Sequence, residues 1–506
     1  MEINFFDLSG GINQASTKTD LGTSLKKIYW SDAQNIEIYD NKGIVKQKGN
    51  KLLTSLTETE SIIAMHEMEA ENIYKLVIIT NSGKIYIYCE SDETLTLVNK
   101  TLTGTDVKFS SFLKGVLIST ESDEMFYIKN NDNYDIVDCN LRNTGGNPFY
   151  PDCISVYKGR VWCSGGSTIY YSALGTYDDF TTAEDAGYIN DFHTDTADII
   201  GMHTYKDYLA IYKKERVYLL SGSSPEDFTV IPFADKGAIA RNSIINVDNK
   251  QYFLSNGIFA LEQVGELNQI RLGSEISLTI KTEFEEFDKS KIQYTNALHY
   301  QNKSQMWFFF PYKKDAYSHT IWINDYVNKC WYKRVVPQDV TCSVVFHNQI
   351  LTADVNGNIY IEDDGNSFNG TPISFMWKSP FLSLNDVHHR KIIEEFYFIL
   401  DDSYDNKFNF SVYKDYDSQY HEDLELIYSR HYNQLVWADN NSPDEPAYCW
   451  VNDEEDIPVW SIGTDVLEKA EICGSCYSVQ LCVEGSELDD NCAIIGLQFR
   501  EIYKDE

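Results

Sequence analysis

Basic residues are scarce in this sequence. Its 506 residues include 42 lysines and arginines against 77 aspartates and glutamates, which gives a formal net charge of -35. A surface that grips nucleic acid needs clustered Lys and Arg, and the sequence has no such cluster. Specific binding to DNA or RNA is therefore not expected. The acidity indicates either an ordinary solvated surface or a surface that must not adhere to DNA passing near it.

Long apolar runs and targeting signals are also missing. The longest apolar stretches, such as residues 306–311, are far shorter than the ~20 residues that a membrane helix needs, so membrane insertion is not expected. No basic segment followed by an apolar run opens the sequence, so no secretory signal is expected. The 11 cysteines are an odd number spread along a long chain, which favours reduced thiols in a cytosolic compartment.

Sequence signatures of enzyme chemistry are absent as well. We find no phosphate-binding loop, no nucleophile elbow and no HExxH helix. Carboxylates are so abundant that no pair of them can be singled out for acid–base catalysis. We therefore predict that the protein is not an enzyme, with no catalytic residues and no cofactor.

Two short patterns resemble metal sites only weakly. Residues 473–476 place two cysteines three positions apart, with Cys482 and Cys492 downstream. Zinc is one interpretation, but the second pair is widely spaced, and buried thiols in strands are the alternative. Residues 354–358 with Glu362 resemble a calcium loop whose glycine is misplaced, and a hairpin turn explains them better. No metal site is predicted.

What the sequence does contain is a repeated pattern of a turn followed by β-formers with an aromatic among them. Its copies are residues 81–87, 123–128, 166–171, 214–219, 255–259, 319–323 and 356–361. Most copies lie roughly 40 to 50 residues apart, the repeat length of a four-stranded propeller blade. Tyrosine and phenylalanine, with 35 and 26 copies, also favour strands. The pattern predicts an all-β protein with a β-propeller of about seven blades over residues 59–365.

One interval between copies is longer and contains a helical pattern. Ile276, Ile280, Phe284 and Phe287 fall at positions i, i+4, i+8 and i+11, which lines one face of a helix. We expect one amphipathic helix within residues 275–288. It would pack on the propeller rim or, alternatively, dock into a partner.

After residue 365 the pattern changes to longer strands. Strand-like runs cover residues 391–400, 407–413, 478–483 and 494–503. They predict an antiparallel β-sandwich over residues 366–506. Residues 439–456 are acidic, carry two prolines, and are expected to form a long exposed loop. A small basic cluster, residues 388–391, is either a solvated strand end or a contact to an acidic neighbouring subunit.

Residues 1–58 do not resemble a blade. An apolar opening runs into a double glycine, and two strand-like runs flank the turn at residues 41–43, which predicts a hairpin. We expect this N-terminal hairpin region to complete or buttress the propeller.

Several short N-terminal motifs carry a resemblance to a known family. They read Ser9-Gly10-Gly11-Ile12-Asn13, Asp32-Ala33-Gln34-Asn35, Gly43-Ile44-Val45 and Lys48-Gly49, and the sandwich opens with Trp377-Lys378-Ser379-Pro380. With a propeller and then a sandwich behind these motifs, the chain resembles the tail hub, or nozzle, proteins of short-tailed phages, also called packaged-DNA stabilisation proteins. The family-motif residues, expected to be structural, are Gly10, Gly11, Asn13, Asp32, Asn35, Gly43 and Gly49.

The resemblance implies a structural protein of the virion tail that is assembled in the host cytoplasm. Such proteins form a homo-oligomeric ring, usually a hexamer, below the portal and its adaptor ring protein. They extend the DNA channel, help to retain packaged DNA, and mount other tail proteins. Genomic DNA would pass through this ring without specific binding.

Two other functional classes remain open. A propeller glycosidase acting on host-surface glycans would need a carboxylate pair in a pocket, and no motif marks one. The absence of repeated Asp-box turns counts against a sialidase. A propeller that recognises glycans or proteins would share the repeats but not the oligomeric ring. The size of the protein in solution distinguishes a ring from a monomer.

Overall fold

The computed structural model describes residues 2–16, 27–39, 42–192, 195–264, 269–313, 319–401, 404–417, 420–428, 466–470 and 475–504. The chain forms two compact units. One is Lys48–Gly370, and the other combines Met1–Gln47 with Thr371–Glu506. No helix in the described part of the chain has the length and apolar character needed to span a membrane.

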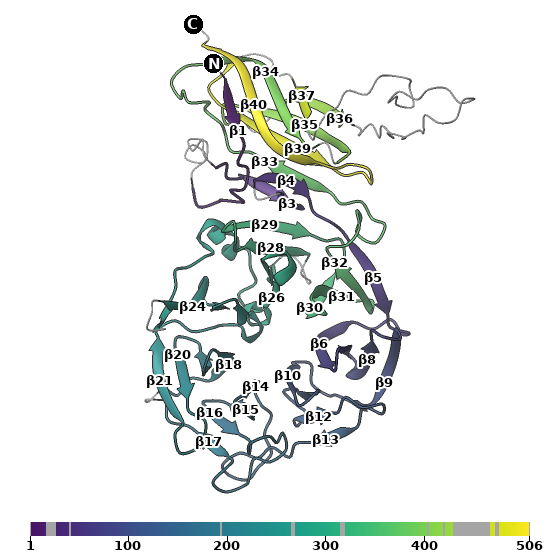
Figure 1. Ribbon diagram of the computed structural model, residues 1–506, viewed down its shortest axis with the longest axis vertical. Helices are drawn as coiled ribbons and strands as arrows, with labels where there is room; N and C mark the ends of the chain where they lie inside the picture. Colours follow the sequence, from purple (N-terminus) through teal and green to yellow (C-terminus); the bar gives the residue numbers. More distant parts are fainter. Residues whose placement is uncertain are drawn as a thin grey trace, which may run out of the picture. The chain divides into compact units, whose positions relative to one another are not determined.

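The unit Lys48–Gly370 is a β-propeller of seven four-stranded antiparallel blades, which confirms the predicted fold class (Figure 1). Blade 1 comprises β6 (Ile62–Ala70), β7 (Ile73–Thr80), β8 (Lys84–Cys89) and β9 (Thr94–Thr101). Blade 2 comprises β10 (Lys108–Phe112), β11 (Gly115–Ser119), β12 (Phe126–Ile128) and β13 (Ile136–Asp138). Blade 3 comprises β14 (Ile154–Tyr157), β15 (Arg160–Gly165), β16 (Thr168–Tyr171) and β17 (Gly187–Ile189). Blade 4 comprises β18 (Ile199–Tyr205), β19 (Tyr208–Lys213), β20 (Val217–Ser221) and β21 (Thr229–Ala234).

The remaining blades follow in chain order, except that the last one takes a strand from near the N-terminus. Blade 5 comprises β22 (Ile245–Val247), β23 (Lys250–Leu254), β24 (Ile258–Val264) and β25 (Gln269–Leu272). Blade 6 comprises β26 (Asn296–Tyr300), β27 (Gln305–Phe309), β28 (Thr320–Asp325) and β29 (Cys330–Val335). Blade 7 comprises β30 (Val340–Phe346), β31 (Gln349–Asp354), β32 (Asn358–Glu362) and β5 (Asn50–Ser55).

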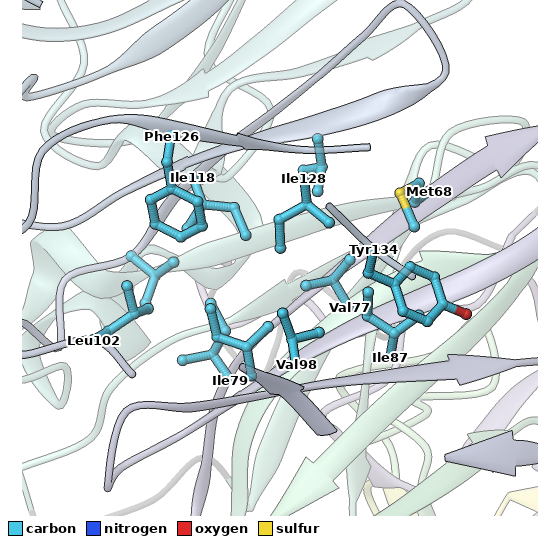
Figure 2. Packing of buried hydrophobic residues seen from close by; sticks show 13 residues of the cluster. Met68, Val77, Ile79, Ile87, Val98, Leu102, Ile118, Phe126, Ile128 and Tyr134 are labelled. Atoms are coloured by element: carbon cyan, nitrogen blue, oxygen red, sulfur yellow. The ribbon is translucent and has the colours of Figure 1, made fainter. Parts of the chain in front are cut away.

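The middle strands of the blades are largely buried, as in β7, β11 and β27. In β7, Val77 and Ile79 pack toward blade 2, while Leu76 and Ile78 pack toward blade 7. Figure 2 shows Val77 and Ile79 in the cluster that they share with Phe126 of blade 2. Alternate side chains of a strand point to opposite faces, so a strand segment buried between two blades is apolar at consecutive positions, as Leu76–Ile79 are. Burying each such aliphatic side chain contributes about 1.5–3 kcal/mol.

The ring is closed by pairing between β5 and β32, with Asn50 opposite Glu362 and Lys51 opposite Ile361. The sequence predicts that residues 1–58 form a hairpin region that completes or buttresses the propeller. The structure divides this region differently, because only the part from Lys48 onward lies in the propeller unit. Earlier in the chain, the strands Ile3–Phe5, Asp32–Gln34 and Gly43–Lys46 pair instead with strands from the C-terminal part of the chain.

The second unit is a β-sandwich built from both ends of the chain. One sheet contains β1 (Ile3–Phe5), β3 (Ile36–Tyr39), β4 (Gly43–Lys46), β34 (Lys391–Leu400), β37 (Val466–Ala470), β38 (Ser475–Cys476) and β40 (Ala493–Lys504). The other contains β2 (Asp32–Gln34), β33 (Phe375–Lys378), β35 (Asn406–Lys414), β36 (Tyr420–Tyr428) and β39 (Val479–Gly485). The two sheets meet through phenylalanines: Phe398 lies edge-on to Phe410 at 4.9 Å, and Phe396 stacks near Phe410 at 5.6 Å. The predicted loop over residues 439–456 lies outside the described residues.

The predicted helical segment consists of 3-10 turns. It is η2 (Leu278–Glu285), with a break at Ile280, and the other short turns are η1 (Arg241–Ser243), η3 (Ile292–Tyr294) and η4 (Gln301–Lys303). The Ser277 side chain does not cap η2; its hydroxyl accepts a hydrogen bond from the Ile258 N–H and donates one to Glu275 Oε1. Ile280 is buried, and Phe287 stacks on Phe310 at 4.2 Å, so the segment packs within the propeller unit.

A salt bridge ties the start of blade 1 to its central hairpin. Lys84 contacts Glu58 at 2.5 Å and Glu60 at 2.6 Å. Hydrogen bonds from Lys84, and then from Ser82, lower the pKa of Glu60 from 4.5 to about 2. The folded chain therefore binds this proton less readily than the unfolded chain. The contribution of Glu60 to stability is present above about pH 4.5 and is lost as the pH falls toward 2.

We predict that Glu60→Gln removes part of the acid sensitivity of the fold. Between pH 5 and pH 2 the denaturation midpoint of the variant should fall less steeply than that of the wild-type chain, because one fewer proton is taken up on unfolding. Urea unfolding at several pH values measures this slope. Glu226→Gln, at an exposed carboxylate of the same propeller, is the control and should retain the wild-type slope. Equal slopes for Glu60→Gln and the wild-type chain would contradict the assignment.

Candidate functional site

The double glycine of the N-terminal motif lies where two backbone segments come close together. The Gly10 N–H donates to the Ile28 carbonyl at 2.9 Å, and a Cβ on Gly10 would lie 2.1 Å from that oxygen. Gly11 has a φ of +67°, and its carbonyl accepts a hydrogen bond from the Trp30 N–H at 2.7 Å. Glycine is required here by steric fit and by backbone conformation.

Asn13 and Asp32 both shape local backbone. Asn13 Oδ1 accepts hydrogen bonds from the N–H groups of Ala15 at 3.1 Å and Ser16 at 3.2 Å, which forms an Asx turn. Asp32, the first residue of β2, accepts a hydrogen bond from the Ala33 N–H at 2.9 Å. The side-chain oxygens of Asn13 and Asp32 therefore stabilise a turn and the start of a strand.

Asn35 and Gly43 hold the N-terminal hairpin in the sandwich. Asn35 is buried with a φ of +53°, and its Nδ2 donates to the Ser374 carbonyl at 2.8 Å. Gly43 lies against β40, since a Cβ there would come within 2.8 Å of the Ile494 carbonyl oxygen. These contacts explain why the hairpin belongs to the sandwich unit.

Gly49 is the one motif residue that lies in the propeller unit. Its N–H donates to the Gly365 carbonyl at 2.8 Å, and a Cβ would lie 1.8 Å from the Ser367 carbonyl oxygen. The motif residues thus do not gather into one site. Each of them fixes backbone near a chain crossing or a strand end.

A buried ion pair stands beside Gly49 and links it to the ring closure. Arg334 of β29 donates to the carbonyls of Lys48 at 2.6 Å and Gly49 at 2.7 Å, and to Glu362 Oε2 at 2.6 Å. The side chains of Arg334 and Glu362 are 1% and 0% exposed. The other Glu362 oxygen accepts from Asn50 of β5 at 3.1 Å. We call Arg334 and Glu362 the closure pair, because they bind the strand that closes the ring.

A second arginine links blades that are not neighbours. Arg241, just before blade 5, donates to Asp106 Oδ2 at 3.1 Å and to the Val107 carbonyl at 3.0 Å, both just before blade 2. It also donates to the Asp152 carbonyl, before blade 3, at 3.4 Å. In a ring of seven blades, a contact from blade 5 to blade 2 crosses the space around the axis. We call Arg241 and Asp106 the axial bridge.

The charges around the axial bridge are mixed. Lys108 is buried and lies 3.1 Å from Asp106. Burial raises the pKa of Asp152, whose carboxylate accepts a hydrogen bond from the Gly166 N–H at 2.7 Å. Acidic and basic groups are paired with one another here. Among the residues named, neither a basic patch suited to DNA nor an isolated pair of carboxylates is formed.

The outer part of the propeller carries a cavity of about 320 Å³ between blades 3 and 4. Its described lining residues are Tyr171, Tyr188, Ile189, Asp191, Pro225, Phe228, Thr229 and Val230. Phe228 lies edge-on to Tyr171 at 5.2 Å and to the buried Trp162 at 5.1 Å. Aromatic side chains thus make the floor, and polar groups stand among the lining residues.

Neither weak metal pattern forms a site in the described part of the chain, which contains no group of three or more His, Cys, Asp or Glu suited to a metal ion. Asp354 Oδ1 accepts hydrogen bonds from the N–H groups of Asn356 and Asn358, so this segment is a hairpin turn. Cys482 and Cys492 are buried in the sandwich unit, while Cys473 lies outside the described residues.

The basic cluster 388–391 is bonded within the sandwich unit. Lys391 is buried and donates to the Tyr477 carbonyl at 2.7 Å. Asp386 pairs with His389 at 2.9 Å and with Lys504 at 2.9 Å. Hydrogen bonds from Lys504 and from the His388 N–H hold the pKa of Asp386 well below its usual value. This network favours the interpretation of the cluster as a strand end, while a contact to an acidic neighbouring subunit stays a prediction.

Comparison with known proteins finds matches among solved structures only. No family model matches the chain, and no curated protein matches it. Among solved structures it is similar to the WD40 β-propeller domain of Doa1, with 11% identity and a TM-score of 0.40 over 62% of this chain and 96% of that chain. It is similar to YCF48 bound to D1 peptide, with 11% identity and a TM-score of 0.40 over 61% of this chain and 94% of that chain.

The sequence interpretation missed the closure pair, the axial bridge and the aromatic cavity. One signal was available for the first. Arg334 stands in Cys330-Trp331-Tyr332-Lys333-Arg334-Val335, an aromatic strand in a chain that has only 42 basic residues. An arginine within a buried strand requires a buried partner. The partner itself, Glu362, could be found only from the pairing of blades.

Proposed function

We propose that this chain is the ring-forming subunit of a short-tailed phage tail hub. In this role several copies assemble around the tail axis below the portal adaptor, retain the packaged genome, and let it pass at ejection. The observation that carries the proposal is the order of motifs and modules along the sequence, which resembles that family from residue 9 to the sandwich.

The contacts of the motif residues support this use of the resemblance. At Gly10, Gly43 and Gly49, an added Cβ atom would clash with a backbone carbonyl oxygen from another segment of the chain. A motif of this kind is characteristic of a fold, because its glycines are required by the close packing of the backbone and not by a reaction. The same residues can therefore identify a structural family without implying catalysis.

The net charge supports transit of DNA rather than its capture. Duplex DNA carries one negative charge per ~1.7 Å, so a basic channel would bind it in a salt-dependent way. A chain with a net charge of -35 repels DNA instead, although screening restricts this repulsion to about 8 Å at physiological salt. Retention of the genome would then depend on steric closure by this ring or its partners.

The axial bridge decides which passage the DNA would use. Because Arg241 and Asp106 join the segments that precede blades 5 and 2, their side chains cross the space around the axis and leave less room for DNA there. In the proposed assembly the channel is the lumen that the copies enclose together. The subunit has no enzymatic part in this process, and its work is mechanical and steric.

The proposal predicts both a ring and a phenotype. Light scattering on the purified chain should give a mass several-fold above 58.2 kDa, and negative-stain images should contain rings. Particles assembled without this protein should package DNA and then lose it, and they should not infect. A purified chain that stays monomeric at all concentrations, together with particles that keep their DNA and infect without it, would overturn the proposal.

A further inference from the structure

The cavity between blades 3 and 4 has the chemistry of a binding site. Its volume of about 320 Å³ falls at the lower end of the roughly 300–1,000 Å³ that small-molecule sites occupy. Tyr171 and Phe228 form an apolar floor, and the exposed side chains of Tyr188, Asp191 and Thr229 lie around it. We propose that this cavity binds a neutral saccharide, of the size of a mono- or disaccharide unit of a glycan.

The floor of the cavity is held in place before any ligand arrives. Arg160, whose side chain is 4% exposed, lies 6.0 Å from the ring centroids of both Tyr171 and Phe228. It donates to the Ser172 carbonyl at 2.9 Å and to Asp185 Oδ1 at 2.6 Å. A site that is already ordered loses little conformational freedom on binding.

The loop that carries Phe228 is fixed in the same way. Asp227 Oδ1 accepts hydrogen bonds from the N–H groups of Ser223 at 2.8 Å and Ser224 at 2.7 Å. These donors hold the pKa of Asp227 below its usual value, and the carboxylate stabilises the turn at residues 223–227. The Phe228 ring is then held against Trp162 and Tyr171.

The position of Arg160 argues against a cationic ligand. Aromatic rings attract cations through their negative faces. The guanidinium of Arg160 already lies over both floor rings, so a second cation on the same rings would meet a like charge. An anionic ligand is disfavoured by Asp191 on the rim and by the net charge of -35. A neutral ligand meets neither penalty.

The mixture of aromatic and polar lining then selects a saccharide among neutral ligands. The C–H face of a pyranose ring is apolar and packs on an aromatic ring, while its hydroxyl groups need hydrogen-bond partners. Tyr188 and Thr229 supply hydroxyls that donate and accept, and Asp191 supplies an acceptor. A purely apolar ligand would bury the Tyr188 and Thr229 hydroxyls without offering them a hydrogen bond.

The lining also indicates binding without cleavage. Glycoside hydrolysis uses two carboxylates that flank the scissile bond. Among the described residues that line the cavity, Asp191 is the single carboxylate. The inference therefore agrees with the absence of enzyme motifs and does not depend on the proposed place of the chain in a tail.

Titration calorimetry of the full chain tests the inference with defined probes. The neutral probes are oligosaccharides of glucose, galactose, mannose, rhamnose and N-acetylglucosamine. Oligosialic acid is the anionic probe, and choline and a lysine-rich peptide are the cationic probes. At least one neutral oligosaccharide should bind, and Tyr188→Ala should weaken that binding at least tenfold. Tyr188 is 51% exposed, so its removal should leave folding intact.

Tyr294→Ala is the matched control, because Tyr294 is 61% exposed and does not line the cavity. It should bind the same saccharide as the wild-type chain does. Failure of every neutral probe would overturn the inference, as would equal affinity in Tyr188→Ala. Binding of only the cationic or only the anionic probes at this cavity would replace it with a charged-ligand site. None of these results bears on ring formation, which is measured separately.

Discussion

Arg334→Ala is expected to destabilise the propeller by about 3–5 kcal/mol, because it leaves the buried Glu362 carboxylate without its positive partner. Arg334 also donates to the carbonyls of Lys48 and Gly49, so the substitution removes hydrogen bonds from the strand that closes the ring. The midpoint of urea unfolding should fall sharply. Limited proteolysis should cut first near residue 48, since blade 7 would lose its grip on β5 (Asn50–Ser55).

Arg216→Ala is the matched control for this prediction. Arg216 pairs with Asp235 at 3.2 Å in the same propeller, but the two side chains are 42% and 89% exposed. Exposed pairs contribute little, since water screens them, so the unfolding midpoint should barely move. If the two variants lost similar stability, the closure pair would not be the element that holds the ring shut.

The closure pair also links stability to the proposed function. If the chain retains DNA under pressure as proposed, its propeller must resist opening, and the closure pair lies at the seam where β5 joins blade 7. Particles that carry Arg334→Ala should therefore lose DNA at a lower temperature than particles with Arg216→Ala. Equal heat resistance of the two particles would argue against a mechanical role for this propeller.

The propeller was predictable because its signal is local and repeated. Each copy places a turn before apolar residues such as Ile85, Tyr86 and Ile87, and blade geometry buries both faces of that strand. The sequence thus reports blade spacing directly. The sandwich was predictable to a lesser degree, since alternation in Leu497 to Arg500 reports a strand but not its neighbour.

The division of the N-terminal region was not predictable from the same signals. Pairing of β1 (Ile3–Phe5) with β40 (Ala493–Lys504) joins residues almost five hundred positions apart, and no local pattern encodes it. The same holds for the axial bridge and for the cavity, whose walls come from two blades. The residues of the axial bridge and of the cavity are distant in the sequence, and no local pattern distinguishes them from other polar and aromatic residues.

Gly49→Ala is the second substitution with a large expected effect. A Cβ at this position would lie 1.8 Å from the oxygen and 2.3 Å from the carbon of the Ser367 carbonyl. These atoms are backbone, so no side-chain rotation relieves the clash, and the chain must shift. The shift would break the hydrogen bond from the Gly49 N–H to Gly365 and the nearby bonds from Arg334. We expect a loss of at least about 2–3 kcal/mol, within the range of severe single substitutions.

Gly145→Ala separates this steric effect from the general effect of adding a methyl group. Gly145 is exposed, and the nearest atom to its would-be Cβ is the side-chain Asn143 Oδ1 at 3.3 Å. Its stability should stay near the wild-type value, because the Asn143 side chain needs to shift by only a few tenths of an ångström and the unfolded chain loses some freedom. Urea unfolding of the two variants measures the difference. If Gly49→Ala unfolded at the same urea concentration as Gly145→Ala, close approach to Ser367 would not be the reason that glycine stands at position 49.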